Sequence, residues 1–296
     1  MSVSTRLTEV FQSAHEIPFD DKSRFIFFSD CHRGDNSWAD DFAKNKSLFF
    51  HALDYYFREG FTYFELGDGD ELYENWRFSD VIYAHSHIFQ RLRDFHLAGR
   101  FHLIYGNHDK ERADPKTAAK TLFSYIDDCT GNEEPLFNGI QVHEGLLLKH
   151  VPTGGKIFLV HGHQGILFAD QWWKFNRFMV RFLWRPLQLI GVDDPTSPAK
   201  NFKKRDILDY KIAEWVKEKN QPTICGHTHR PSFAAEGKPP YFNDGSCIHP
   251  RCITGIEIDK GQIQLVEWAL TTNKDGYLVV AKDILAGPRK VASLFA

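Results

Sequence analysis

Five short polar clusters, each placed directly after an apolar run, constrain the fold of this chain more than any other feature. They read SDCH, LGDGDE, GNHD, VHGH and CGHTH, and they begin at residues 29, 66, 106, 160 and 225. One such cluster alone is common surface decoration, but five in succession are hard to explain that way. Because ligands collect at the carboxyl ends of strands in α/β sheets, the clusters predict one shared site.

The segments around the first three clusters predict a sheet with crossover helices. The runs RFIFFSD, FTYFELGD and RFHLIYGNHD read as buried strands, and segments 40–60 and 79–99 carry apolar residues at helical spacing. Strand, helix, strand, helix, strand is the pattern of an α/β fold.

The second half of the chain predicts two hairpins and a further helix. One hairpin turns at Gly154-Gly155, a helix covers 205–220, and another hairpin turns near Lys260-Gly261. Because further strands follow without helices, a second, more antiparallel sheet is expected. No linker interrupts the pattern, so we expect a single domain over 1–296.

Composition narrows the class of protein. The net charge of -3 gives no general attraction to nucleic acid, so no nucleic acid partner is predicted. The five cysteines follow no CxxC spacing, and the N-terminus lacks a basic start followed by a long apolar run. No apolar stretch is long enough to span a membrane. A cytoplasmic protein with free thiols is the expectation.

The side chains in the clusters are metal ligands by type. Carboxylate, amide and imidazole groups without thiolates suit Mn, Fe, Zn or Co. They are too many for one ion, so two ions that share a carboxylate are the economical interpretation. The clusters supply Asp30, His32, Asp68, Asn107, His108, His161, His163, His227 and His229.

In their order and spacing, the five clusters resemble the signature of the calcineurin-like metallophosphoesterase superfamily. The resemblance implies a four-layer α/β/β/α sandwich of two mixed sheets flanked by helices. It also implies two divalent metal ions, with Mn expected first and Fe, Zn or Co as alternatives. Asp30, His32, Asp68 and His229 would hold one ion, and Asp68, Asn107, His161 and His227 the other.

The same resemblance implies a reaction in which a metal-bridging hydroxide attacks phosphorus. His108 matches the histidine that lies beside the scissile phosphate without binding metal, and it can protonate the leaving oxygen. Either Asp109 or Glu71 could keep that imidazole cationic, and the sequence does not distinguish them.

An aromatic and basic segment, residues 166–192, lies between the fourth and fifth clusters. Arg177, Arg181 and Arg185 recur at a spacing of four, so they share one helical face. The segment is either a helical insertion packed on its own domain, or a lid that binds phosphate or contacts lipid. The placement of this segment, and the sequence GDGDELYENW at the second cluster, resemble the UDP-2,3-diacylglucosamine pyrophosphatase branch. That branch carries Arg at the position of His108.

Several polar residues next to the clusters are candidate substrate contacts. His163 is expected to support the metal ligands or to contact substrate. Each of the others is equally a candidate for a surface salt bridge. The candidates for phosphate are Arg33, Asn36, Arg77, Lys110, Arg177 and Arg181.

Together these features predict a dinuclear metal-dependent phosphoester hydrolase acting on a phosphodiester or a nucleotide-linked pyrophosphate. The expected partner is a phosphorylated small molecule or a nucleotide-linked substrate. The alternatives are a protein-phosphatase-like phosphomonoesterase and a non-catalytic metal-binding scaffold of the same fold.

Overall fold

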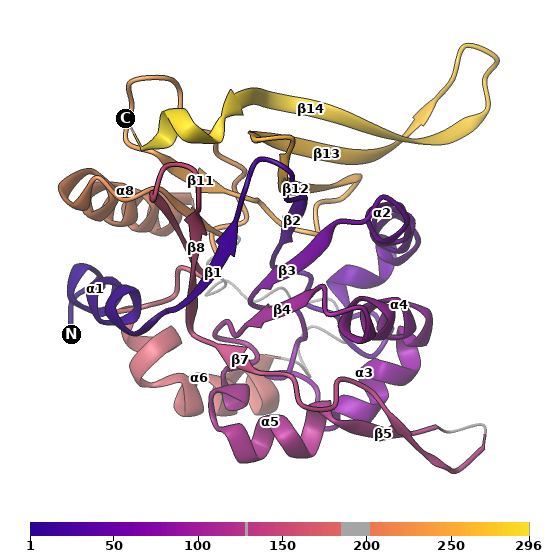
Figure 1. The fold of residues 1–296 in the computed structure, drawn as a ribbon. Helices are drawn as coiled ribbons and strands as arrows, with labels where there is room; N and C mark the ends of the chain where they lie inside the picture. Colours follow the sequence, from indigo (N-terminus) through magenta and orange to yellow (C-terminus); the bar gives the residue numbers. More distant parts are fainter. Residues whose placement is uncertain (128–129, 185–201, 296) are drawn as a thin grey trace.

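The computed structural model describes residues 1–127, 130–184 and 202–295. They form two large β-sheets packed face to face, with helices on both outer faces (Figure 1). This arrangement confirms the predicted four-layer α/β/β/α sandwich.

The larger sheet has seven strands in the order β14-β13-β12-β2-β3-β4-β7. Its parallel half contains β2 (Phe25–Phe28), β3 (Thr62–Leu66), β4 (Phe101–Ile104) and β7 (Val142–His143). Its antiparallel half contains β12 (Cys252–Asp259), β13 (Gln262–Thr272) and β14 (Leu278–Lys290).

The smaller sheet has five strands in the order β1-β8-β9-β10-β11. Its strands are β1 (His15–Phe19), β8 (Gly145–His150), β9 (Lys156–Val160), β10 (Thr223–Cys225) and β11 (Tyr241–Asn243). Strands β8 and β9 are antiparallel, as the turn at Gly154-Gly155 predicts, and the other neighbours are parallel. A separate small hairpin joins β5 (Ser124–Ile126) to β6 (Glu133–Pro135).

The expectation of a second, more antiparallel sheet is wrong. The C-terminal strands instead extend the first sheet, because β12 pairs antiparallel with the free edge of β2, with Ile256 opposite Phe27. Strand β12 is apolar on both faces: Ile253 packs in the outer core and Ile256 between the sheets. That pattern suits a strand inside a covered sheet.

Helices cover both outer faces. Against the larger sheet pack α2 (Lys46–Arg58) and α4 (Ser86–Leu97), and against the smaller sheet pack α1 (Val3–Ser13) and α8 (Phe202–Lys219). The remaining α-helices are α3 (Phe78–Ala84), α5 (Pro115–Leu122) and α6 (Trp173–Met179). None of the described helices is both long and apolar enough to cross a membrane.

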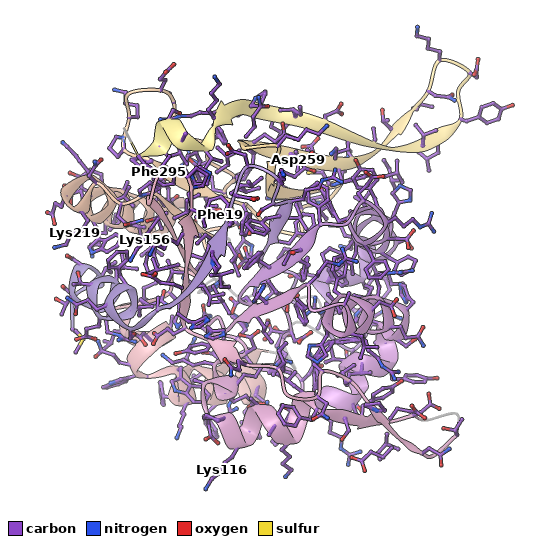
Figure 2. The ribbon with its side chains drawn as sticks, viewed as in Figure 1. Phe19, Lys116, Lys156, Lys219, Asp259 and Phe295 are labelled. Atoms are coloured by element: carbon purple, nitrogen blue, oxygen red, sulfur yellow. The ribbon has the colours of Figure 1, made fainter. Side chains whose placement is uncertain are left out.

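A continuous apolar core lies between the two sheets. Phe27, Phe64 and Leu66 enter it from the larger sheet, and Leu159 and Ile224 from the smaller one. Side chains fill the space between the layers, with Phe19 and Phe295 at one end of this core (Figure 2).

The expected single domain over 1–296 stays a prediction.

The segment 79–99, predicted as one helix, forms two helices that meet at His85. His85 leaves helical geometry, with φ of -129° and ψ of 32°. Its buried imidazole Nε2 lies 2.9 Å from Asp40 Oδ2. The helix therefore breaks at a residue that makes a buried tertiary contact, and apolar spacing alone does not indicate this break.

The predicted insertion is helical where the structure describes it. A π-helix at Leu167–Gln171 leads into α6, and a second π-helix covers Val180–Trp184. Residues 185–192 of the predicted segment, including Arg185, lie outside the described residues.

Candidate metal centre

The carboxyl ends of five strands from both sheets converge on one site. Strands β2, β3 and β4 of the larger sheet lead into the first three polar clusters, and β9 and β10 of the smaller sheet lead into the last two. The two sheets therefore supply ligands from opposite sides of the same position.

Two groups of side chains that share Asp30 have ligand atoms within 4.8 Å of one another, and His32, Glu71 and His108 form a third such group. Both groups include Asp30, whose Oδ1 lies 3.0 Å from His229 Nε2 and 3.6 Å from His32 Nε2. The Oδ2 atom of Asp68 lies 3.2 Å from His161 Nε2. The groups are Asp30, His32 and His229, and Asp30, Asp68, His161 and His227.

Hydrogen bonds orient the ligand atoms toward the site. The Nδ1 atom of His161 donates to the Leu66 carbonyl at 2.8 Å, which leaves Nε2 free for a metal ion. The backbone N–H of His227 donates to Asp30 Oδ2 at 2.7 Å. These contacts are made by the protein itself, and they hold the ligand atoms toward the site.

The unsatisfied atoms at this site fit divalent cations. Four buried ligand atoms make no hydrogen bond to any described residue: Asp30 Oδ1, Asn107 Oδ1, His161 Nε2 and His227 Nε2. A buried polar atom without a partner costs about 1–3 kcal/mol. Four such atoms converging from different strands are accounted for together by bound cations of the type that carboxylate, amide and imidazole ligands prefer.

The backbone is strained where the ligands are. Asp30, His32, Asp68, His227 and His229 all have φ between 48° and 67°, in the left-handed region. Non-glycine residues adopt this region rarely, and such strain concentrates at functional sites. The turns after β2, β3 and β10 therefore direct their ligands at an energetic cost.

Gly106 is required by the close approach of a ligand. A Cβ atom at this position would lie 2.0 Å from Asp68 Oδ1. That same oxygen accepts the backbone N–H of His108 at 2.8 Å. Any side chain at position 106 would therefore displace Asp68.

His108 lies beside the ligands and forms a pair with Glu71. Its Nδ1 is 2.8 Å from Glu71 Oε1, and its ring stacks on Tyr73 at a centroid distance of 4.5 Å. Burial would lower the pKa of His108, but the carboxylates of Glu71 and Asp68 raise it above the usual value. Burial alone would raise the pKa of Glu71, but the imidazoles of His108 and His32 lower it to about 2. The pair is therefore held as imidazolium and carboxylate.

Glu71, and not Asp109, contacts His108, which resolves the alternative that the sequence leaves open. The buried Asp109 accepts the N–H of Gly106 at 2.6 Å and lies 3.4 Å from Arg112. Its burial raises the pKa of Asp109 to about 7. The prediction of Asp109 as a catalytic residue is corrected: it supports the turn that carries Asn107.

The structure also contradicts the prediction that Arg33 contacts the substrate. Its guanidinium is buried and bonds Glu65 through both terminal nitrogens at 2.8 Å and Asp70 through Nε at 2.7 Å. Asp70 in turn bonds Arg112 at 2.6 Å. Arg33 therefore belongs to a buried ion network beneath the site and is not directed at a phosphate.

The two insertion arginines are held by the protein. Arg177 pairs with Glu111 at 2.5 Å. Arg181 donates to the carbonyls of Tyr73 at 3.1 Å and Leu72 at 2.7 Å, and it covers the ring of Trp76. The structure thus corrects the predicted phosphate-binding stripe: Arg177 fastens the insertion to the segment after β4, and Arg181 fastens it to the loop after Glu71.

The other predicted substrate contacts lie in different surroundings. Lys110 donates to the backbone carbonyl of Asp170 at 2.7 Å, and Asn36 accepts from Lys46 at 2.9 Å. Arg77 is exposed at the start of α3. His163 is fully buried beside His161, and neither of its ring nitrogens bonds a described residue.

Sequence reasoning missed Ser29 and Asp244 beneath the ligands. The Ser29 hydroxyl contacts Asp30 Oδ2 and lies 2.7 Å from Asp244 Oδ1. Asp244 follows β11 directly, so the polar pair after the apolar run YF was the signal that could have identified it.

Fold and site together define a metal-binding α/β/β/α sandwich of the phosphoesterase class. The chain belongs to the calcineurin-like phosphoesterase family, whose model matches residues 23–231. No curated protein matches the chain.

Solved structures similar to this chain include two proteins of low sequence identity. Vps29 from Chaetomium thermophilum is 10% identical, with a TM-score of 0.40 over 90% of this chain and 96% of that one. A cold-active protein-tyrosine phosphatase from a Shewanella species is 12% identical, with a TM-score of 0.39 over 91% of this chain and 82% of that one.

Proposed function

We propose that the chain is a dinuclear metal-dependent phosphoesterase that hydrolyses a phosphodiester or a nucleotide-linked pyrophosphate. The observation that supports this most strongly is the convergence of unpartnered buried ligand atoms beside the His108–Glu71 pair. Asp30, His32, Asp68 and His229 would hold one ion, and Asp68, Asn107, His161 and His227 the other. When bound, the ions supply Lewis-acid activation of water and offset charge on the phosphoryl group.

The residues of the chain supply the remaining chemistry. Glu71 holds Nδ1 of His108, so Nε2 is the nitrogen available to donate a proton to the leaving oxygen. Tyr73 limits the motion of the imidazole by stacking on it. Because the side chain of His108 is partly exposed, a substrate can reach it.

Proton donation assists substrates whose leaving group is an alkyl alcohol, a class that includes many phosphodiesters. An alkyl alcohol leaves slowly unless its oxygen is protonated, whereas a nitrophenolate leaves unaided. The aromatic side chains of Trp76, Phe178 and Phe182 are exposed beside the loop after Glu71 and offer surface to an apolar or base-bearing group. The aromatic surface supports a diester or a nucleotide-linked pyrophosphate, and the proton donor suits the diester in particular.

A hydrolysis screen with added Mn tests the proposal. Its arms are monoesters, phosphoserine peptides, diesters, cyclic nucleotides and nucleotide-sugar pyrophosphates. We expect the highest kcat/KM among diesters or nucleotide-linked pyrophosphates. Highest turnover of phosphopeptides would favour the phosphatase alternative, and bound metal without turnover of any arm would favour a scaffold.

We also propose that the segment 166–192 contacts lipid. Trp172, Phe175, Phe178 and Phe182 are all more than half exposed, which is unusual for neighbouring aromatic side chains. Co-sedimentation with anionic phospholipid vesicles tests it. Binding that Phe175→Ser and Phe178→Ser abolish would support the contact, and no binding by the wild type would contradict it.

A further inference from the structure

The C-terminal hairpin forms a projecting arm that the proposed catalytic site does not use. Strands β13 and β14 run past α2 and leave the body of the molecule (Figure 1), and the side chains at their tip stand clear of it (Figure 2). Asn273 Oδ1 closes the tip by accepting the backbone N–H groups of Asp275 at 3.0 Å and Tyr277 at 2.9 Å. The turn at the tip of the arm is thus held by hydrogen bonds.

One face of the arm is apolar and uncovered. The register pairs Thr272 with Leu278 and Val266 with Ile284, so Leu270, Leu278 and Ile284 lie on the face that Trp268 occupies. Trp268 is buried and bonds Tyr56 of α2. Toward the tip from Trp268, Leu270 and Leu278 are 54% and 71% exposed, and on the other side of Trp268 Ile284 is 52% exposed. Exposed apolar faces of this kind mark contact surfaces.

The arm also ends in an open strand edge. Strand β14 is the last of its sheet, and no described strand pairs with its outer side. Natural proteins protect such edges with charge, proline or bulges. From 278 to 284 the strand reads LVVAKDI, and of its two charged residues Lys282 is bound to Glu257 at 2.9 Å. Over residues 278–284 the edge therefore has little protection against pairing, and Pro288 and the bulges of β14 lie further along the strand.

We propose that a second copy of this chain pairs antiparallel with β14, around a two-fold axis at Ala281. Ile284 would then lie opposite Leu278 of the second copy, and Lys282 opposite Val280. Asp283 would face Val279, so no like charges meet. An axis one residue further along, at Lys282, would oppose two ammonium groups, which is unfavourable.

The area available suits a dimer of modest stability. Leu270, Leu278 and Ile284 are joined by Tyr277, which is 70% exposed. In both copies together these side chains expose on the order of 1,000 Å², which is the most that they could bury and lies near the lower limit for specific interfaces. Backbone pairing along the edge adds to this contact and joins the two seven-stranded sheets into one.

Sedimentation velocity of the full chain at tens of micromolar tests the proposal. The wild type should sediment as a dimer, and the double variant Leu278→Lys, Ile284→Lys as a monomer with unchanged circular dichroism and turnover. Leu97→Lys, which adds the same charge to an exposed leucine of α4, should remain a dimer. A monomeric wild type, or a double variant that stays dimeric, overturns the proposal.

A short bismaleimide cross-linker tests the register. In a dimer with its axis at Ala281, Ala281→Cys places two thiols opposite each other and should cross-link well above the wild-type background. Val279→Cys separates the thiols by about four residues of strand, roughly 13 Å. Equal cross-linking at both positions contradicts the register.

Discussion

The Nδ1 atom of His108 lies 2.8 Å from Oε1 of Glu71, and this contact decides which end of the imidazole meets the substrate. The other ring nitrogen is left to donate a proton. Glu71 Oε2 also lies 3.0 Å from Nδ1 of the metal-ligand candidate His32. One carboxylate therefore orients both a ligand and the proton donor.

Glu71→Gln is expected to lower kcat by about 100-fold for a diester with an alkyl leaving group, because His108 loses its charge partner. The loss should be smaller for bis-p-nitrophenyl phosphate, whose leaving group needs no proton. Steady-state kinetics on both substrates, with metal content measured in parallel, check this. Equal losses on the two substrates would argue that Glu71 does not act through proton transfer.

Arg181→Ala is expected to lower kcat about ten-fold while metal content stays the same. Arg181 holds the backbone carbonyls of Leu72 and Tyr73, and Tyr73 stacks on His108, so the change loosens the proton donor. Arg177→Ala, which removes a contact with Glu111 instead, is the matched control and should have a smaller effect. Unchanged kinetics in Arg181→Ala would show that the insertion does not position the site.

Asp70→Ala is expected to destabilise the fold by about 3–5 kcal/mol, because it leaves buried Arg33 and Arg112 without a shared partner. Urea unfolding at fixed metal concentration measures the change. Arg230→Ala, which breaks the exposed pair with Asp206, should leave the free energy of unfolding nearly unchanged. Similar small losses in both variants would contradict the structural role of the network.

His102 predicts a loss of stability in acid. Burial, aided by His143 and His15, lowers the pKa of His102 to about 4 from its usual 6.5. The unfolded chain takes up this proton below pH 6.5 and the folded chain does not, so stability falls as the pH drops from 6.5 to 4. The slope is at most about 1.4 kcal/mol per pH unit.

His102→Gln should remove that part of the slope. Urea unfolding of both proteins between pH 4 and 7 isolates it, because other titrating groups are common to the two chains. Parallel stability curves for the wild type and the variant would show that His102 does not titrate as described.

The convergence of the ligand candidates could be predicted from sequence because each of them follows a buried strand. A buried strand followed by a polar turn places Asp30, Asp68 or His161 at the carboxyl edge of its sheet. The five clusters also follow one another along the chain in the order of the family's motifs, which made the resemblance specific.

The corrected arginines depend on partners distant in sequence. Arg33 is adjacent to His32, but its guanidinium meets Glu65 on the neighbouring strand β3, and only the paired sheet brings them together. The pairing of β12 with β2 could likewise not be predicted from the pattern of apolar residues, since several strand edges could accept β12.

Metal content tests the central claim most directly. The wild-type protein, saturated with Mn and freed of excess by gel filtration, should contain two ions per chain by inductively coupled plasma mass spectrometry. Asp68→Ala should retain at most one, because Asp68 is expected to contact both. A wild type that saturates at a single ion, or an Asp68→Ala protein that still holds two, would contradict the account.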